Sequence, residues 1–241
     1  MMVRFRFPRF RFLRGLAFRY SLFFLMAFVF ILFIPIFTGI MLSGIILYMN
    51  SQKEAKVLTE RTISQFQNVL LPTELVPQTL VQAMENPNIN YMDVIRITKD
   101  FVRHDTVVFG TCLAFEPNMV NPDKYWDAHY TFEKDGKLTT RNIGGPDYDY
   151  FKMDWYRLPK LLNRPVWTEP YFDKGGGDTL MCTYSTPIYR DINGKRTFTG
   201  VLTMDISLTG IDQLVKSVTI FKTGYGLLVS KKGQIIASPR P

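Results

Sequence analysis

The longest apolar pattern in the chain lies near its N-terminus. Residues 20–52, between Arg19 and Lys53, carry no charged side chain, and an α-helix needs only about 20 residues to cross the hydrocarbon core of a bilayer. A cleaved signal peptide is the alternative, but its apolar region would be about 7 to 15 residues long and a small-residue cleavage site would follow. The sequence YMNSQKEAK offers no such site. We therefore predict an uncleaved transmembrane helix over residues 20–49.

Helical spacing continues beyond this segment. Residues 51–71 predict an amphipathic stalk helix, and its apolar arc is formed by Leu58, Ile63, Phe66, Val69 and Leu70. Pro72 and Pro77 are expected to interrupt it. A second helix is predicted over residues 91–104, and its apolar side is formed by Met92, Ile95, Ile97 and Phe101.

The period then changes to the alternation that is typical of strands. Residues 107–117 alternate and end at a proline, which predicts a first strand. Two hairpins are predicted around the tight-turn dipeptides Asp135-Gly136 and Asn193-Gly194. Along residues 200–206, one face carries Leu202, Met204 and Ile206 and the other carries Val201, Thr203 and Asp205.

A helix over residues 207–218 is predicted to follow, capped by Ser207 or Thr209. Its apolar stripe is formed by Ile211, Leu214, Val215 and Val218. A further hairpin is predicted around Lys232-Gly233. Helices that lead into and out of a mostly antiparallel sheet indicate an α+β fold.

The net charge of +8 arises mainly at the N-terminus. Six of the 29 basic residues precede the uncharged segment, and these are Arg4, Arg6, Arg9, Arg11, Arg14 and Arg19. The remainder holds 23 basic against 21 acidic residues. A basic tail beside an apolar span is typical of a cytoplasmic flank attracted to anionic lipid, so we predict no nucleic-acid binding. The part after about Ser51 is expected outside the cytoplasm.

The segment between the two predicted hairpins is rich in aromatic and acidic residues and poor in apolar periodicity, as functional loops often are. Gly175 to Gly177 lack the strand-GxxxxGK-helix context of a phosphate loop, so a turn is predicted. His104 and His129 lie in unrelated elements, and we predict no metal and no cofactor. The sequence shows no plausible nucleophile-base pair, so an enzyme is not expected.

Three segments in order, DWYRLPKLLNRPVWTEPYFD, GGGDTLMCTYSTPIYRDINGKRTFTGVLTMDISL and KTGYGLLVSKKGQIIASP, resemble the double Cache sensor domains of bacterial transmembrane receptors. That family includes chemoreceptors, histidine kinases and SpoIIE-type serine phosphatases, and the phosphatase-linked members look most similar. The resemblance covers about residues 51–241 and implies a PAS-like lobe entered by a long stalk helix.

On this basis the chain is divided as follows: a basic cytoplasmic tail over 1–19, a transmembrane helix over 20–49, stalk and packing helices over 50–104, a membrane-distal Cache lobe over 105–220, and the beginning of an incomplete membrane-proximal lobe over 221–241. The resemblance also implies the strand order 2-1-5-4-3. Cys112 and Cys182 would then lie on strands separated by the strand of Asp205, about 10 Å apart, which is too far for a disulfide.

Cache domains that bind amino acids use a tyrosine seven residues before a Trp-Tyr pair, an arginine two before the tryptophan, a later Tyr-x-Asp and an aspartate that ends a strand. The corresponding positions here are Tyr148, Met153, Trp155, Tyr156, Tyr171, Asp173 and Asp205. The resemblance implies that the two aspartates accept hydrogen bonds from an ammonium group. Met153 cannot bind a carboxylate, so an amine is favoured unless Lys152 or Arg157 replaces the arginine.

Simpler interpretations stay open at these positions. Trp155 and Tyr156 can be core aromatics, Tyr171 a packing residue, Asp173 a turn residue, and Asp205 a helix cap. The leading functional prediction is the extracytoplasmic ligand-sensing domain of a bacterial membrane receptor, which binds a small amine or amino acid and dimerises through the stalk. The alternatives are a membrane-tethered envelope enzyme and a structural envelope protein with a vestigial pocket.

Overall fold

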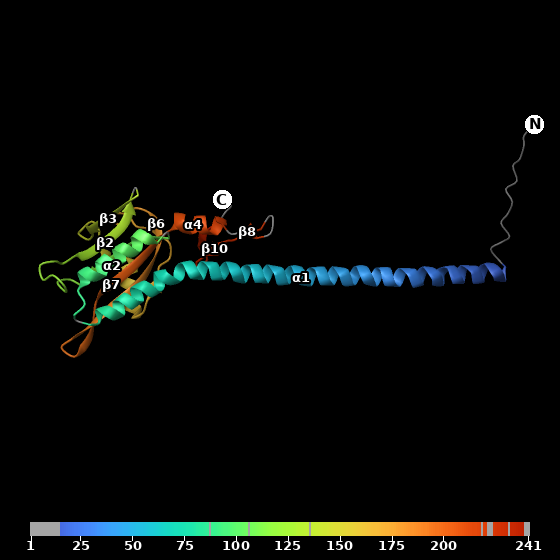
Figure 1. Cartoon of the computed structure of the whole chain (residues 1–241), viewed down its shortest axis with the longest axis horizontal. Helices are drawn as coiled ribbons and strands as arrows, with labels where there is room; N and C mark the ends of the chain where they lie inside the picture. The colour runs from blue at the N-terminus through green and yellow to red at the C-terminus, as the bar shows by residue number, and fades with distance from the viewer. Residues whose placement is uncertain are drawn as a thin grey trace, which may run out of the picture. The chain divides into compact units, whose positions relative to one another are not determined.

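A computed structural model describes residues 15–86, 88–105, 107–134, 136–217, 219–220, 224–230 and 232–238 (Figure 1). The chain divides into two compact units, Met1–Thr59 and Glu60–Pro241. Most of the basic tail predicted over residues 1–19 lies outside the described residues, and so does Asp135 of the first predicted hairpin.

Helix α1 (Leu16–Met84) contributes residues to both units. In the first unit its apolar side chains, from Leu16 to Met49, are exposed rather than packed in a core. By length and composition it is a candidate membrane span, as predicted from the uncharged segment. Exposure of this kind is what a helix surrounded by lipid requires.

The predicted break at Pro72 and Pro77 is wrong, because α1 runs through both prolines to Met84. A proline inside a helix costs about 3 kcal/mol through its missing hydrogen bond and its ring. Packing offsets that cost: Pro77 itself is buried, and a stripe that also contains Thr73, Val81 and Met84 is buried along the same stretch of the helix. Each large apolar side chain so buried contributes about 1.5–3 kcal/mol.

Helix α2 (Tyr91–His104) confirms the second predicted helix, and the Asn90 side chain caps it by accepting from the Met92 N–H at 2.9 Å. The predicted apolar side is only partly correct. The fully buried stripe consists of Val94, Thr98 and Val102, whereas Met92 and Ile97 are exposed. A threonine is tolerated there because Thr98 Oγ1 donates to the Ile95 carbonyl at 3.1 Å.

The second unit is built on a seven-stranded antiparallel sheet with the order β3-β2-β1-β7-β6-β4, in which β5 also pairs with β6. Its strands are β1 (Val108–Phe115), β2 (Asp127–Lys134), β3 (Lys137–Asn142), β4 (Val166–Trp167), β5 (Tyr171–Phe172), β6 (Leu180–Ile192) and β7 (Lys195–Ser207). This confirms the α+β fold. The expected Cache order 2-1-5-4-3 is found as β2-β1-β7-β6-β4, and β3 is an additional strand at the edge next to β2.

Both hairpins are confirmed by the strand register. Lys134 pairs with Lys137 and Ile192 with Lys195, so each turn has two residues. Asn193 and Gly194 have φ angles of 54° and 77°, the left-handed conformation that a tight hairpin turn requires. Cys112 on β1 and Cys182 on β6 are free and are separated by β7, as predicted.

The two faces of the sheet pack against different elements. One face meets the end of α1 and α2 (Figure 1) through a cluster of buried residues formed by Val81, Met84, Val94, Leu113, Phe115, Ile188 and Leu202. The other face meets η2 (Tyr150–Lys152) and α3 (Asp154–Leu162), where Cys112, Ala114, Tyr130 and Val201 pack with Tyr150, Trp155 and Tyr156. The alternation predicted along residues 200–206 is thereby confirmed.

Helix α4 (Leu208–Ser217) follows β7, and Ser207 Oγ caps it by accepting from the Gly210 N–H at 3.2 Å. Ile211 and Val215 pack with Ala237, while Val218 and the side chain of Leu214 lie outside the described residues. The short strands β8 (Thr219–Ile220) and β9 (Gly224–Tyr225) form one pair. Strands β10 (Leu228–Val229) and β11 (Ile235–Ala237) form the predicted hairpin around Lys232-Gly233.

Candidate functional site

Five of the six predicted ligand-binding residues lie around one small cavity on the α3 side of the sheet. The cavity is lined by Cys112, Tyr130, Ile143, Tyr148, Trp155, Tyr171, Asp173, Thr203 and Asp205. Strands β1, β2 and β7 form its floor, α3 supplies Trp155, and β5 with the turn that follows supplies Tyr171 and Asp173. Residues far apart in the sequence therefore meet at one point.

Asp205 is held at the floor by its strand register. It pairs with Thr183 of β6, and Thr183 Oγ1 donates to Asp205 Oδ1 at 2.8 Å. The Tyr171 hydroxyl lies 2.8 Å from the same Thr183 oxygen. Asp205 is thus an internal residue of the strand and not the cap of the next helix, a role that Ser207 fills.

Burial, together with the smaller effect of the nearby carboxylate of Asp173, raises the pKa of Asp205 to about 7. The side chain is almost fully buried, so water cannot stabilise its charged form. A carboxyl group with a pKa near neutrality can be either protonated or charged, depending on what occupies the cavity.

Asp173 closes the cavity from the opposite side and organises the glycine-rich turn. Its Oδ1 accepts from the Tyr148 hydroxyl at 2.6 Å and its Oδ2 accepts from the Gly177 N–H at 2.7 Å. Burial raises the pKa of this carboxyl as well, although both hydrogen bonds oppose the shift. Asp173 is therefore a turn residue and a cavity residue together, and the two interpretations left open by the sequence are compatible.

Only glycine fits at position 176 of this turn. A Cβ atom added to Gly176 would lie 2.0 Å from Asp173 Oδ2, far inside van der Waals contact. The turn is confirmed at Gly175 to Gly177, and its function is to let the backbone wrap around the buried carboxylate of Asp173.

None of the described residues that line the cavity is basic. Lys152 and Arg157, the two candidates to replace the missing arginine, are 83% and 62% exposed. They form ion pairs with Asp149 at 3.0 Å and with Asp154 at 2.8 Å, respectively. The structure therefore gives no support to either residue as the carboxylate-binding group.

Tyr156 is the predicted residue that does not line the cavity. Its hydroxyl donates to Glu116 Oε1 at 2.8 Å, and Lys160 Nζ donates to the same oxygen at 2.8 Å. Its ring packs against Tyr150 and Phe198. This geometry supports the core-aromatic interpretation of Tyr156, because its polar atom is already bound outside the cavity.

Four lining residues were not among the predicted set: Cys112, Tyr130, Ile143 and Thr203. Thr203 could have been predicted, because it lies two residues before Asp205 and so on the same face of the strand. Tyr130 could have been found only with the register of β1 and β2, which places it opposite Cys112. Thr183, which holds Asp205, had no local signal, because its role depends on the pairing of β6 with β7.

The cavity has space of about 10 Å³ for the centre of a water molecule, which is room for roughly one water. Any larger ligand must displace part of the wall. Chemically, two carboxylates and several tyrosine hydroxyls form a site for a hydrogen-bond donor with positive charge.

Residues 94–213 match a family model described as the methyl-accepting chemotaxis protein-like, first PDC sensor domain. Among curated proteins, chemotaxis protein McpA of Pseudomonas putida is 31% identical over 116 residues, which is 46% of this chain and 17% of McpA. PctB of Pseudomonas aeruginosa is 30% identical over 112 residues, again 46% of this chain and 17% of the relative. The chain thus matches less than a fifth of the length of these receptors.

Solved structures of sensor domains share the fold. The extracellular domain of the histidine kinase mmHK1S-Z3 is 25% identical with a TM-score of 0.62, over 77% of this chain and 72% of that one. The ligand-binding domain of Campylobacter jejuni chemoreceptor Tlp3, in complex with L-valine, is 23% identical with a TM-score of 0.58, over 79% and 72%.

These matches confirm the resemblance drawn from the sequence. The sensor domains of this family are non-enzymatic ligand-binding domains, so the matches support a sensor domain over the envelope-enzyme alternative. The chain belongs to the Cache-type sensor domains, with residues 94–213 forming the first PDC sensor domain of the methyl-accepting chemotaxis protein-like family.

Proposed function

We propose that the cavity binds the ammonium group of a small amine or amino acid and that Asp173 and Asp205 are its acceptors. The observation that carries this proposal is the placement of two buried carboxylates on one cavity whose described lining residues include no cation. Two buried negative charges without a counter-ion are costly, and a ligand that brings the cation removes that cost.

The named relatives support an amino-group ligand. Solved ligand-binding domains with this fold hold L-valine in Tlp3, L-Gln in PctB and GABA in PctC. All three ligands carry an amino group and a carboxylate. The amine side of such a site is present here at Tyr148, Tyr171 and the two aspartates, whereas Met153 stands where an arginine would bind the carboxylate.

We also propose the topology and assembly expected from the sequence. Residues 1–19 would lie in the cytoplasm, residues 20–49 would cross the membrane, and the sensor would face the exterior. Residues 50–104 would contain the stalk and packing helices, and the stalk helix would form a homodimer. The positive-inside rule supports the orientation. Residues 105–220 would then form the membrane-distal lobe and residues 221–241 the start of the next.

The ligand class can be tested with matched sets of compounds on the full chain in lipid nanodiscs. Isobutylamine, isovalerate and L-valine share a carbon skeleton and differ only in which charged group they keep. We expect isothermal calorimetry to detect binding of isobutylamine and L-valine and none of isovalerate. Equal binding of the amine and the acid would refute an ammonium site, and no binding across a broad amine and amino acid panel would favour the vestigial pocket.

Isosteric variants locate the site. Asp173→Asn and Asp205→Asn keep the shape of each side chain and remove its charge, so each is expected to weaken amine binding at least tenfold, in the range of a lost charge-assisted hydrogen bond. Asp154→Asn is the matched control, because Asp154 is exposed and paired with Arg157 on the outside of α3. Unchanged affinity in both cavity variants would exclude this cavity as the binding site.

A further inference from the structure

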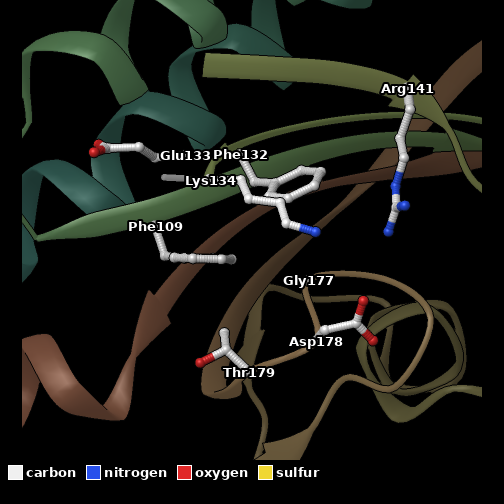
Figure 2. A pocket seen from close by; sticks show the side chains of 8 residues that line it. All are labelled: Phe109, Phe132, Glu133, Lys134, Arg141, Gly177, Asp178 and Thr179. Atoms are coloured by element: carbon white, nitrogen blue, oxygen red, sulfur yellow. The ribbon is translucent and has the colours of Figure 1, made fainter. Parts of the chain in front are cut away.

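A second and larger cavity lies on the other side of the glycine turn. Its volume is about 280 Å³, near the lower end of small-molecule sites. Figure 2 shows the residues that line it, namely Phe109, Phe132, Glu133, Lys134, Arg141, Gly177, Asp178 and Thr179. Gly177 lines this cavity while its N–H binds Asp173 of the first one, so one turn separates the two.

Strand register places two cations on the wall of this cavity. Arg141 of β3 pairs with Tyr130 of β2, so both side chains lie on the same face of the sheet, together with Phe132 and Lys134. Glu133 alternates to the opposite face. Figure 2 agrees: the Lys134 ammonium and the Arg141 guanidinium are directed toward the turn, and the Glu133 carboxylate is directed away from both.

The charges of this wall are not neutralised by ion pairs. Neither Lys134 nor Arg141 forms an ion pair with another described side chain, and the Arg141 guanidinium donates instead to the backbone carbonyls of Gly175 and Gly176. Asp178 is the carboxylate that faces the cavity from the turn, and its Oδ1 accepts from the Gly175 N–H at 2.7 Å. The lining residues therefore direct two cations and one carboxylate into the cavity, while the second acidic side chain, Glu133, is directed away.

Aromatic rings supply the apolar part of the same wall. Phe109 and Phe132 lie with ring centroids 6.0 Å apart, and the Arg141 guanidinium lies 5.2 Å from the centroid of Phe132. A guanidinium held over a ring face keeps its edge N–H groups available in a plane, which is the geometry that a carboxylate binds. Apolar rings beside two cations match a ligand that has both an acidic group and an apolar body.

We propose that this second cavity binds a small organic carboxylate with an apolar or aromatic body, held by Arg141 and Lys134 against Phe109 and Phe132. This site is distinct from the amine site and does not depend on it. It changes the state of the sensor through the turn, because a carboxylate on Arg141 competes with the carbonyls of Gly175 and Gly176 for the same donors. By linkage, any effect on ligand affinity in the first cavity is reciprocal.

The test uses para-fluorobenzoate and fluorine NMR on the full chain in lipid nanodiscs, with para-fluorobenzamide as the neutral compound of the same shape. We expect broadening and saturable binding of the acid and at least tenfold weaker binding of the amide. Lys134→Gln and Arg141→Gln are each expected to weaken binding of the acid several-fold. Lys195→Gln, an exposed lysine at the start of β7, is the control and should bind like wild type.

Two further outcomes decide the proposal. Para-fluorobenzoate is expected to bind the wild type whether or not isobutylamine binds it, so the amine and carboxylate sites can fail separately. Equal binding of acid and amide, or unchanged binding of the acid in Lys134→Gln and Arg141→Gln, would overturn the inference. Arg141→Gln also removes the hydrogen bonds that Arg141 donates to the turn. Weaker binding of para-fluorobenzoate is therefore required in Lys134→Gln as well, and unchanged binding in that variant would overturn the inference.

Discussion

Replacement of the buried carboxylate at the cavity floor should make the sensor domain more stable at neutral pH. Asp205→Asn keeps the side-chain shape and the oxygen that accepts from Thr183, and it removes the charge that lies near Asp173. Residues that serve ligand binding are often unfavourable for stability in the absence of ligand. The variant measures how unfavourable this one is.

The magnitude follows from the pKa of Asp205. The folded protein raises that pKa from its ordinary value of 3.8 to about 7, so the folded state favours the protonated carboxyl. The corresponding stability is fully present below about pH 4 and is lost as the pH rises through 7. A shift of roughly three units at 1.36 kcal/mol each gives a loss of up to about 4 kcal/mol above pH 7, and asparagine avoids it.

The assay is a series of thermal melts of the full chain in nanodiscs, followed by circular dichroism between about pH 4.5 and pH 8 without added amine. One kcal/mol shifts the melting temperature by about 2–4 °C in a domain of this size. The variant should therefore melt close to wild type at the acid end and roughly 10 °C higher at the alkaline end. Asp154→Asn, on the surface, should show no such divergence.

Two results would contradict this prediction. A difference in melting temperature that does not change with pH would mean that Asp205 is not titrating in this range. A variant that is less stable than wild type at pH 8 would mean that the charged carboxylate is compensated in the folded protein by a group that the lining residues do not reveal.

Three other predictions follow from the same geometry. Affinity for isobutylamine should rise up to tenfold per pH unit between about pH 5 and pH 7 and level off above, because the ammonium competes with the proton on the buried carboxyl; a flat pH profile in calorimetry would contradict this. Gly176→Ala should abolish amine binding, since its Cβ would collide with the Asp173 carboxylate, whereas Gly210→Ala, with its nearest neighbour at 3.4 Å, should bind normally. Tyr156→Phe should lower the free energy of unfolding by about 1 kcal/mol through the lost bond to Glu116, yet leave amine affinity unchanged; weaker binding would return this tyrosine to the site.

The fold was predictable wherever the signal was local. Asn193-Gly194 fixed the central hairpin and its register, because the two residues adopt the turn conformation with little help from the rest of the protein. The helix through Pro72 and Pro77 was not predictable, because the sequence shows the missing hydrogen bonds but not the burial that offsets them. Local sequence rules fail where packing against a distant strand determines whether a helix continues.

The site residues show the same distinction between local sequence signals and the pairing of distant segments. Asp205 could be placed by alternation along one strand, but its partner Thr183 required the pairing of two strands. The family motif predicted both Trp155 and Tyr156 as ligand-binding residues. They are consecutive residues on α3, and consecutive residues on a helix point about 100° apart. Trp155 therefore lines the cavity while Tyr156 points to Glu116, and a motif of adjacent letters cannot make that distinction.

The charges around the glycine turn connect the two proposed sites. The charge of Asp173 raises the pKa of Asp205, and the charge of Asp178 raises the pKa of Asp173. Arg141, which lies beyond the turn, lowers the pKa of Asp173, but burial has the larger effect. The sensor without ligand therefore holds a carboxyl pair that is not fully ionised at neutral pH. A bound ammonium allows full ionisation, so ligand binding, proton release and the position of the turn become a single equilibrium.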